Sequence, residues 1–359
     1  MRARRPEVLP VLAGLLGLAL GWRPVSAIAK DPDDASYVRL VERYASGDRE
    51  AAVAALRGWG DHELWLHQKT VLEARRKLDG AWLRAAVMLH SDADEVGLPA
   101  FVGVEQRRPC SGQNGRRAAG YAGLLAKRDD GRAFARRFFL AMAHRCHWEC
   151  SLDEAEQWAG EGLDHFPDDP QLLLALGAVH EHAATTGWGA FRTLEAASAE
   201  RERRFKRARR LYREALAADP GLVLARLRLG RVHWHLGEGE TARTRLEEVL
   251  TATHDPALLY LAYLFLGQVH EDAGRLEPAV ARYQMALDIH PGAQAAAVAL
   301  SHALRLAGDS ARSRDALARA LAEAGHRGNG REDKYWNYLS WPAIDRGRLF
   351  DELHQEAVR

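Results

Sequence analysis

The sequence lacks the short motifs that mark most nucleotide-binding and hydrolytic enzymes. It has no phosphate loop of the GxxxxGK form, no glycine-rich dinucleotide fingerprint, and no GxSxG, CxxC or HExxH pattern. The nearest approach to a zinc-binding helix is His62-Glu63 with His67, but these histidines stand one residue further apart than that motif requires. These absences predict a protein without catalytic activity and without a cofactor.

An excess of charge of one sign is missing as well. The chain has 50 basic and 49 acidic side chains, so no whole-protein field draws it to nucleic acid, and we expect no nucleic-acid partner. Strand-like alternation of apolar and polar residues is also absent, which favours a helical chain. With 359 residues, of which 47% are hydrophobic, such a chain can bury a long core.

Long hydrophobic runs are absent, but a short one lies near the start of the chain. Residues 1–5 contain three arginines, residues 11–20 are apolar, and Val25-Ser26-Ala27 offers small residues to a signal peptidase. We therefore expect residues 1–27 to be a signal peptide and the protein to be exported to the periplasm or cell envelope. The apolar stretch is shorter than the roughly 20 residues that span a bilayer. An uncleaved signal that tethers the protein to the membrane is the alternative.

Cysteine is scarce, with only Cys110, Cys146 and Cys150. In an oxidising compartment these thiols can form disulfides. Cys146 and Cys150 share a helix face, so a bridge between them would need the helix end to loosen, and unpaired buried thiols are the alternative. Together with His144 and His147 they offer soft ligands for zinc or copper. The histidines and cysteines face different sides of the helix, however, so no metal site is expected.

A repeated pattern occupies the second half of the chain. Its clearest copy runs from Tyr260 to Pro291 and contains Leu266-Gly267, Val269-His270, Gly274, Ala279, Tyr283 and Ala286. Similar copies centre on Leu229-Gly230 and Leu176-Gly177, and weaker ones cover 300–320 and 143–167. A fixed period of this size is typical of a solenoid of paired helices.

This pattern resembles the tetratricopeptide repeat (TPR) family, whose repeat is a helix-turn-helix with the same leucine-glycine pair, turn glycine, alanines and closing proline. Five copies cover roughly Arg136 to Gly325. The resemblance implies an all-α, right-handed superhelical solenoid of TPR repeats, with an N-terminal helical segment and a C-terminal capping helix. It also implies a surface for binding a protein or peptide.

The composition divides the chain into five parts. These are the signal peptide (1–27), an N-terminal helical region resembling a degenerate repeat (31–96), a flexible linker rich in glycine, proline and arginine (97–131), the TPR array (132–325) and an aromatic-rich C-terminal cap (326–359). In the N-terminal region we expect helices at 35–44, 49–59, 63–78 and 82–90. The aromatic segment is expected to cover the open end of the last repeat, as solenoid caps do. A docking peptide for another protein is the alternative.

An insertion at 184–207 interrupts the second repeat of the array. After a loop it continues as Thr193 to Ala218, which can form one long helix. Seven basic residues lie between Glu200 and Arg210. A solvated, protruding helix face is the favoured interpretation, and a patch for an anionic ligand is the alternative.

Three histidines, His180, His233 and His270, occupy the same place in successive repeats. Equivalent side chains of neighbouring repeats are separated by about the helix-packing distance, roughly 8–10 Å. Zinc ligands must approach the ion to about 2 Å. We therefore expect packed core histidines at these positions rather than a metal site.

In the resembled family, the first helix of each repeat lines a concave groove that holds a peptide. Matching spacing gives the groove-facing candidates His144, His147, Trp148, Glu181, Arg231, Trp234, His235, Gln268, Glu271, His302 and Arg305. Trp234 and Arg231, one turn apart, are the expected anchors. The sequence thus predicts a non-catalytic scaffold of the cell envelope that binds a partner protein. A membrane-tethered assembly factor is one alternative, and a histidine-rich metal-binding protein or enzyme is the other.

Overall fold

The computed structural model describes residues 34–59, 79–94, 112–149, 151–187, 193–327, 333, 335, 338 and 346–358. All regular secondary structure in these residues is α-helical, which confirms the all-α prediction. The predicted signal peptide (1–27) and the expected helix at 63–78 lie outside the described residues. No helix within them is long and apolar enough to cross a membrane.

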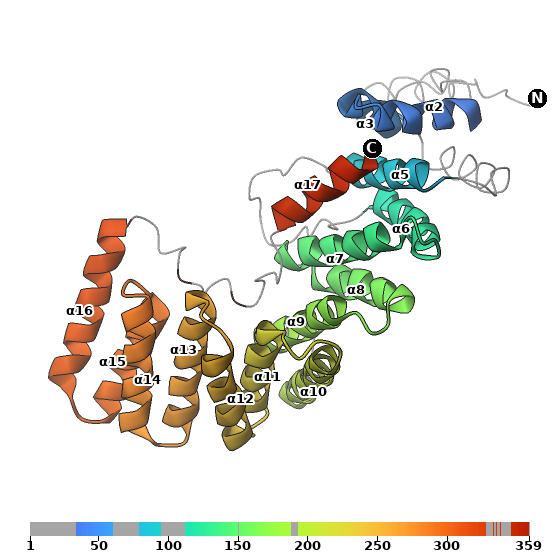
Figure 1. Cartoon of the computed structure of the whole chain (residues 1–359). Coiled ribbons are helices and arrows are strands. Elements are labelled where there is room, and N and C mark those ends of the chain that lie inside the picture. Colours follow the sequence, from blue (N-terminus) through green and yellow to red (C-terminus); the bar gives the residue numbers. More distant parts are fainter. Residues whose placement is uncertain are drawn as a thin grey trace, which may run out of the picture.

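The described helices follow one another in a curved array (Figure 1). They are α2 (Asp34–Ala45), α3 (Arg49–Arg57), α5 (Gly80–Ala93), α6 (Gln113–Ala126), α7 (Arg132–Trp148), α8 (Leu152–His165), α9 (Pro170–Thr186), α10 (Leu194–Ala218), α11 (Val223–His235), α12 (Gly239–Ala252), α13 (Pro256–Asp272), α14 (Leu276–Ile289), α15 (Gln294–Leu306), α16 (Ser310–Arg327) and α17 (Arg346–Ala357). From α5 to α16, consecutive helices pack as pairs. The pairs from α7/α8 to α15/α16 correspond to the five predicted repeats.

Glycines set the close approach of the two helices within a pair. At Gly177 an added Cβ would lie 2.5 Å from the ring of Tyr212, and at Gly230 it would lie 2.8 Å from Leu246 Cγ. At Gly267 it would collide with the ring of Tyr283. A large residue of the second helix therefore fills the space that each glycine leaves. The predicted register of the repeats is confirmed at these three pairs.

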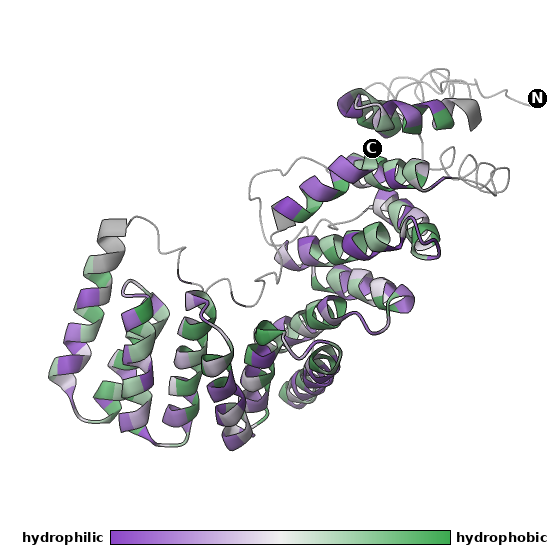
Figure 2. Ribbon diagram, viewed as in Figure 1, coloured by the Kyte–Doolittle hydropathy of each residue, from purple (hydrophilic) through white to green (hydrophobic). Residues whose placement is uncertain are grey.

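The first helices of the pairs are more apolar than the second ones, most clearly α9 and α13 compared with α10 and α12 (Figure 2). A first helix contacts its own partner and both neighbouring pairs, so more of its surface is buried. Asp169 and Asp255 cap α9 and α13 by accepting bonds from backbone N–H groups, and a proline follows each cap. Both features favour a helix start at these points.

One expected boundary is wrong. The flexible linker predicted for 97–131 contains α6, which packs on α5 and α7. Four apolar side chains, Ala118, Tyr121, Ala122 and Leu125, are buried along one face of this helix. Its glycines and arginines obscured that stripe in the sequence. The remaining part of the predicted linker, residues 97–111, lies outside the described residues.

The predicted long helix of the insertion is confirmed as α10. Its basic residues are largely matched by acidic ones. Arg204 lies 3.0 Å from Glu156, Arg209 lies 2.6 Å from Glu238, and Lys206 lies 2.6 Å from Glu202. This pairing supports the favoured interpretation of a solvated, ion-paired face.

The described residues of the C-terminal segment, 333, 335, 338 and 346–358, do not lie over the end of the last repeat, contrary to the prediction. Asp333, Tyr335 and Tyr338 instead contact the first helices of the array, and α17 packs on α7 and α5 (Figure 1). The expected covering helix therefore lies beside the N-terminal half of the molecule. Leu321 on α16 remains 67% exposed. The physical reason is that the tyrosines and Asp333 find buried hydrogen-bond partners on the first helices.

Polar contacts hold α17 in place. His354 Nε2 lies 2.9 Å from Asp92 Oδ1, and Arg49 donates to the backbone carbonyl of His354. Arg137 and Glu356 form a further ion pair between α7 and α17. These bonds join the two ends of the described chain.

Candidate functional site

The first helices of the pairs form one continuous inner face. In the array from α7 to α15, the first helices of neighbouring pairs pack directly on each other, and the second helices make less extensive contacts of this kind in the described residues. The array therefore curves toward its first helices. A partner that follows this face would contact α9, α11, α13 and α15 together.

One part of the inner face is filled by a buried polar cluster, here called the Glu181 cluster. It consists of Glu181 on α9, Tyr212 on α10, Arg228 and Arg231 on α11, and Tyr338 from the C-terminal segment, all of them buried. Arg231 and the Tyr338 hydroxyl donate to Glu181 Oε1 at 2.7 and 3.0 Å. Arg228 and the Tyr212 hydroxyl donate to Oε2 at 3.0 and 2.7 Å. One carboxylate thus receives four donors.

Charge keeps Glu181 ionised in this cluster. Burial by itself would raise its pKa, but Arg228 and Arg231 outweigh that effect and the pKa is lowered. Two guanidinium groups face one carboxylate, so the cluster is positively charged in total. The ring of Tyr338 lies 4.5 Å from Arg228 Cζ and 4.8 Å from Arg231 Cζ. In these cation–π contacts the negative face of the ring attracts both guanidinium groups, which stabilises the surplus positive charge.

Besides Tyr338, two further residues of the C-terminal segment, Asp333 and Tyr335, contact the inner face. Together the three residues are here called the tail anchors. Asp333 accepts a bond of 2.7 Å from the Tyr260 hydroxyl and one of 2.9 Å from the Ala295 backbone N–H. Ala295 lies in the first turn of α15, whose own N-cap residue, Ala293, provides no side-chain cap. Asp333 therefore supplies the cap that α15 lacks. Tyr335 packs near the ring of Phe265.

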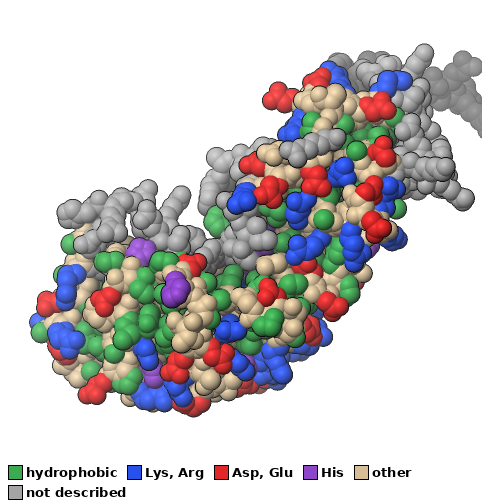
Figure 3. Space-filling model, viewed as in Figure 1, with side chains coloured by type: hydrophobic (Ala, Val, Ile, Leu, Met, Phe, Trp, Pro, Cys, Tyr) green, Lys and Arg blue, Asp and Glu red, His purple; other side chains and the backbone are tan. Residues whose placement is uncertain are grey.

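The neighbouring part of the inner face is open. A pocket of about 350 Å³, here called the open pocket, lies between α11, α13 and α15. Its lining consists of Trp234, Gln268, Glu271, Asp272, Tyr283, Ala295, Val298, Ala299, His302 and Tyr335. Val298 is 56% exposed. In Figure 3, apolar side chains gather over the α11–α15 end of the array, with charged side chains along the rim.

Hydrogen bonds hold the polar side chains of the open pocket in place. Trp234 Nε1 donates to Asp272 at 2.7 Å, and the Tyr283 hydroxyl donates to Glu271 at 2.8 Å. His302 Nδ1 lies 2.6 Å from the other oxygen of Glu271. Gln268 Oε1 is buried and has no hydrogen-bond partner among the described residues. A buried acceptor beside an exposed valine is suited to a peptide that brings an N–H group and an apolar side chain.

The predicted groove residues fall into three groups. Trp234, Gln268, Glu271 and His302 come together in the open pocket. Glu181 and Arg231 lie in the Glu181 cluster, and His147 is buried and bonded to His182. The rest are not brought to either place: His144 is buried, Trp148 and Arg305 are exposed on α7 and α15, and His235 stacks on Phe205. Because Arg231 is only 4% exposed, it is not available to a partner while Tyr338 covers it, contrary to the expectation of an exposed anchor.

Several residues of the Glu181 cluster and the open pocket were not predicted from the sequence. Arg228 stands three residues before Arg231, and that spacing could have indicated two guanidinium groups on one helix face. The tail anchors lay in the recognised aromatic segment but were assigned to the wrong place. Val298 carries no motif, because a single valine on a helix predicts only burial.

The histidines shared by the repeats are buried, as are His144 and His147. His180 contacts Arg204, His233 is paired with Glu238, and burial lowers the pKa of His180 to about 3. In the part of the chain that the structure describes, no group of three His, Cys, Asp or Glu side chains is placed to hold a metal ion.

Cys146 is disulfide-bonded, so the alternative of a buried free thiol is wrong for this residue. The other two cysteines, Cys110 and Cys150, lie outside the described residues. The bond belongs to the N-terminal end of the array, at the last turns of α7.

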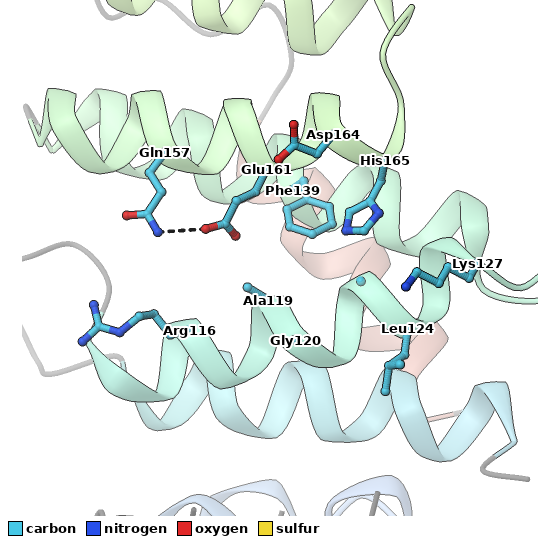
Figure 4. Close-up of a pocket in the computed structure, with 11 residues that line it drawn as sticks. Arg116, Ala119, Gly120, Leu124, Lys127, Phe139, Gln157, Glu161, Asp164 and His165 are labelled. Atoms are coloured by element: carbon cyan, nitrogen blue, oxygen red, sulfur yellow. Dashed lines mark hydrogen bonds between the residues drawn. The ribbon is translucent and has the colours of Figure 1, made fainter. Parts of the chain in front are cut away.

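A second hollow, of about 460 Å³, lies between α6 and α8 (Figure 4). Its α6 wall contains Ala119, Gly120 and Gly123, and small residues there leave space between the helices. Gln157 donates to Glu161 across the α8 side. The hollow includes none of the predicted groove residues, and small side chains account for its shape.

The fold and its inner face define an α-solenoid of paired helices with a groove on the side of the first helices. The model of the Tetratricopeptide repeat family matches residues 199–263, which span most of α10, the pair α11/α12 and the first half of α13. No curated protein matches the sequence.

Solved structures with a similar fold include MamA proteins. A crystal structure of the MamA protein is 17% identical, covers 54% of this chain and 93% of that chain, and has a TM-score of 0.41. MamA 41-end from Desulfovibrio magneticus RS-1 is 21% identical, covers 54% and 97%, and has a TM-score of 0.43.

Proposed function

We propose that this protein is a non-catalytic scaffold of the cell envelope that binds a partner protein in the groove of its inner face. The observation that carries the proposal is the open pocket, where four of the predicted groove residues meet. The pocket combines an exposed valine, a tryptophan and hydrogen-bonded carboxylates with a buried acceptor that has no partner in the part of the chain that the structure describes. Such a mixture of an apolar contact and a few placed polar groups favours recognition of a peptide segment.

The placement in the envelope is part of the proposal. It is supported by the basic, apolar and small-residue pattern of residues 1–27 and by the disulfide bond of Cys146, because disulfides persist in oxidising compartments. N-terminal sequencing of the purified protein is expected to start near Ile28 or Lys30. An intact Met1 in a membrane fraction would instead support a tethered assembly factor. An intact Met1 in a soluble cytoplasmic fraction would overturn the placement.

The partner can be captured with the wild-type protein, and a variant of the open pocket then tests whether the partner binds there. Immobilised wild-type protein is incubated with solubilised native envelope, and the retained proteins are identified by mass spectrometry. The affinity of each retained protein is then measured for wild type and for Val298→Asp. If the open pocket is the binding site, Val298→Asp weakens binding by about thirtyfold or more, as truncation of an interface anchor does.

Leu194→Asp is the matched control, because Leu194 is 90% exposed at the start of α10, away from the open pocket. It introduces the same charge and is expected to leave the affinity unchanged. Both variants are expected to keep the wild-type melting temperature, since exposed positions contribute little to stability. Equal affinity of wild type and a folded Val298→Asp protein would remove the open pocket from the proposed function.

A further inference from the structure

The inner face already holds one peptide segment, and that segment belongs to the chain itself. Asp333 and Tyr338 stand five positions apart in sequence, and each makes side-chain hydrogen bonds to the array. Asp333 is 3% exposed and Tyr338 is 1% exposed. The tail anchors therefore occupy the groove in the way that a bound peptide ligand would.

Each anchor occupies a place that selects for its chemistry. The Asp333 carboxylate lies at the N-terminus of α15, where it accepts a bond from the Ala295 backbone N–H and where the helix dipole favours an anion. The Tyr338 hydroxyl donates to Glu181, and its ring lies against Arg228 and Arg231. A phenylalanine would keep the ring contacts and lose the bond to Glu181. A basic side chain at either place would face an uncompensated positive charge.

The occupied and open parts of the groove are continuous. Tyr335, which lies between the other two anchors in sequence, also lines the open pocket beside Trp234 and His302. A peptide bound in the open pocket therefore lies next to the places that Asp333 and Tyr338 fill. It can extend into them only if the tail anchors leave.

We propose that the groove recognises a partner segment with an acidic residue followed five positions later by a tyrosine, and that the chain's own tail anchors occupy this site as an intramolecular competitor. This inference rests on the proposed function, since it names the chemistry of the partner. The tail is covalently attached, so its effective concentration at the groove is on the order of millimolar. A separate partner molecule must therefore bind the groove more strongly than the tethered tail does, or it must bind a chain whose tail has already left the groove.

The test uses the full chain and a fluorescent synthetic peptide that copies residues 331–341. Binding is measured by anisotropy for wild type and for the Asp333→Ala/Tyr338→Ala double variant, in which the competitor is weakened. The variant is expected to bind the peptide up to about 1000-fold more tightly than wild type, the ratio of a millimolar effective concentration of the tethered competitor to a micromolar dissociation constant. Peptides with alanine at the position of Asp333 or of Tyr338 are expected to lose most of this binding.

Folding of the variant is checked by its melting curve, and the milder Asp333→Asn/Tyr338→Phe protein takes its place if the double alanine variant unfolds. Equal peptide affinity for wild type and a folded variant, or binding by neither, would overturn the inference. So would a peptide that binds equally well after its aspartate and tyrosine are both replaced. None of these results changes whether Val298→Asp weakens an envelope partner, so a failure here is distinct from a failure of the proposed function.

Discussion

Two glutamates in this protein occupy the same position of the repeat and lead to opposite outcomes. Glu181 and Glu271 each follow a histidine near the end of a first helix, and each accepts a bond from a tyrosine of the paired helix, Tyr212 or Tyr283. Glu181 is fully buried beneath Tyr338. Glu271 lines the open pocket and meets His302, whose side chain is 47% exposed. The same local design thus supports a filled site in one pair and an open site in another.

The difference lies in what each carboxylate meets beyond its own pair. Two arginines of α11 and the tail tyrosine complete the shell of Glu181. At Glu271 the corresponding contact comes from a histidine on α15, which leaves the pocket accessible. A repeat therefore provides the carboxylate and its tyrosine, and the residues around this pair decide whether the site is filled or open.

The largest expected effect concerns the filled site. Glu181→Gln leaves Arg228 and Arg231 buried without their shared counter-charge, and breaking a buried ionic cluster in this way costs about 3–5 kcal/mol. Urea unfolding monitored by circular dichroism measures the loss. Glu271→Gln is the matched variant, with an expected cost below about 1 kcal/mol, because its partner His302 is 47% exposed and water screens the pair. Equal losses in the two variants would contradict the contrast between the sites.

The second prediction concerns the framework beneath the open pocket. Gly267→Leu would push into the ring of Tyr283, and overpacking of this kind costs about 1–3 kcal/mol. Because the Tyr283 hydroxyl holds Glu271, partner binding should weaken as well. Gly239→Ala is the control, since its Cβ would meet nothing within 4 Å. An unchanged melting temperature for Gly267→Leu would mean that the assigned register of this pair is wrong.

The third prediction compares the stability lost when one tyrosine hydroxyl is removed at each of the two glutamate sites. Tyr338→Phe removes a buried donor to Glu181 and is expected to cost about 1 kcal/mol, the usual net value of one hydrogen bond. Tyr283→Phe removes the bond to Glu271 and should cost less, because water reaches the open pocket and can replace the donor. Thermal melts of both variants under the same conditions give the comparison. A larger loss for Tyr283→Phe would reverse the assignment of filled and open sites.

The smallest expected effect is a pH dependence of stability that comes from His354 on α17, the helical part of the C-terminal segment. Burial lowers the pKa of His354, but the hydrogen bond and charge of Asp92 outweigh it, and the pKa is raised above its usual value near 6.5. A raised folded-state pKa means that this contribution to stability is fully present below about pH 6.5 and is lost as the pH rises through the raised pKa. The midpoint of urea unfolding should therefore fall over that range.

The pH dependence can be assigned with Asp92→Asn, which removes the charge that holds the proton on His354. This variant is expected to lack the decline and to be less stable than wild type at low pH. An undiminished decline in Asp92→Asn would place the titrating group elsewhere.

Much of the array could be predicted from sequence because its determinants are local. The leucine-glycine pairs, the turn glycines and the closing prolines each act within one helix pair, so their spacing defined five repeats that the structure confirms. The inner face followed from the same spacing, and four of its predicted residues meet in the open pocket. Helix α6 was missed because its apolar stripe is interrupted by glycine and arginine.

The sequence by itself determined the all-α class and the period of the repeats, because these depend on contacts between residues close in the chain. Only the tertiary structure decided where the tail anchors bind, which glutamate is buried and which part of the groove stays open. Tyr338 meets Glu181 across 157 positions of sequence, and no local pattern specifies a pairing at that separation. It follows from the array placing a charged cavity where a returning tyrosine can fill it.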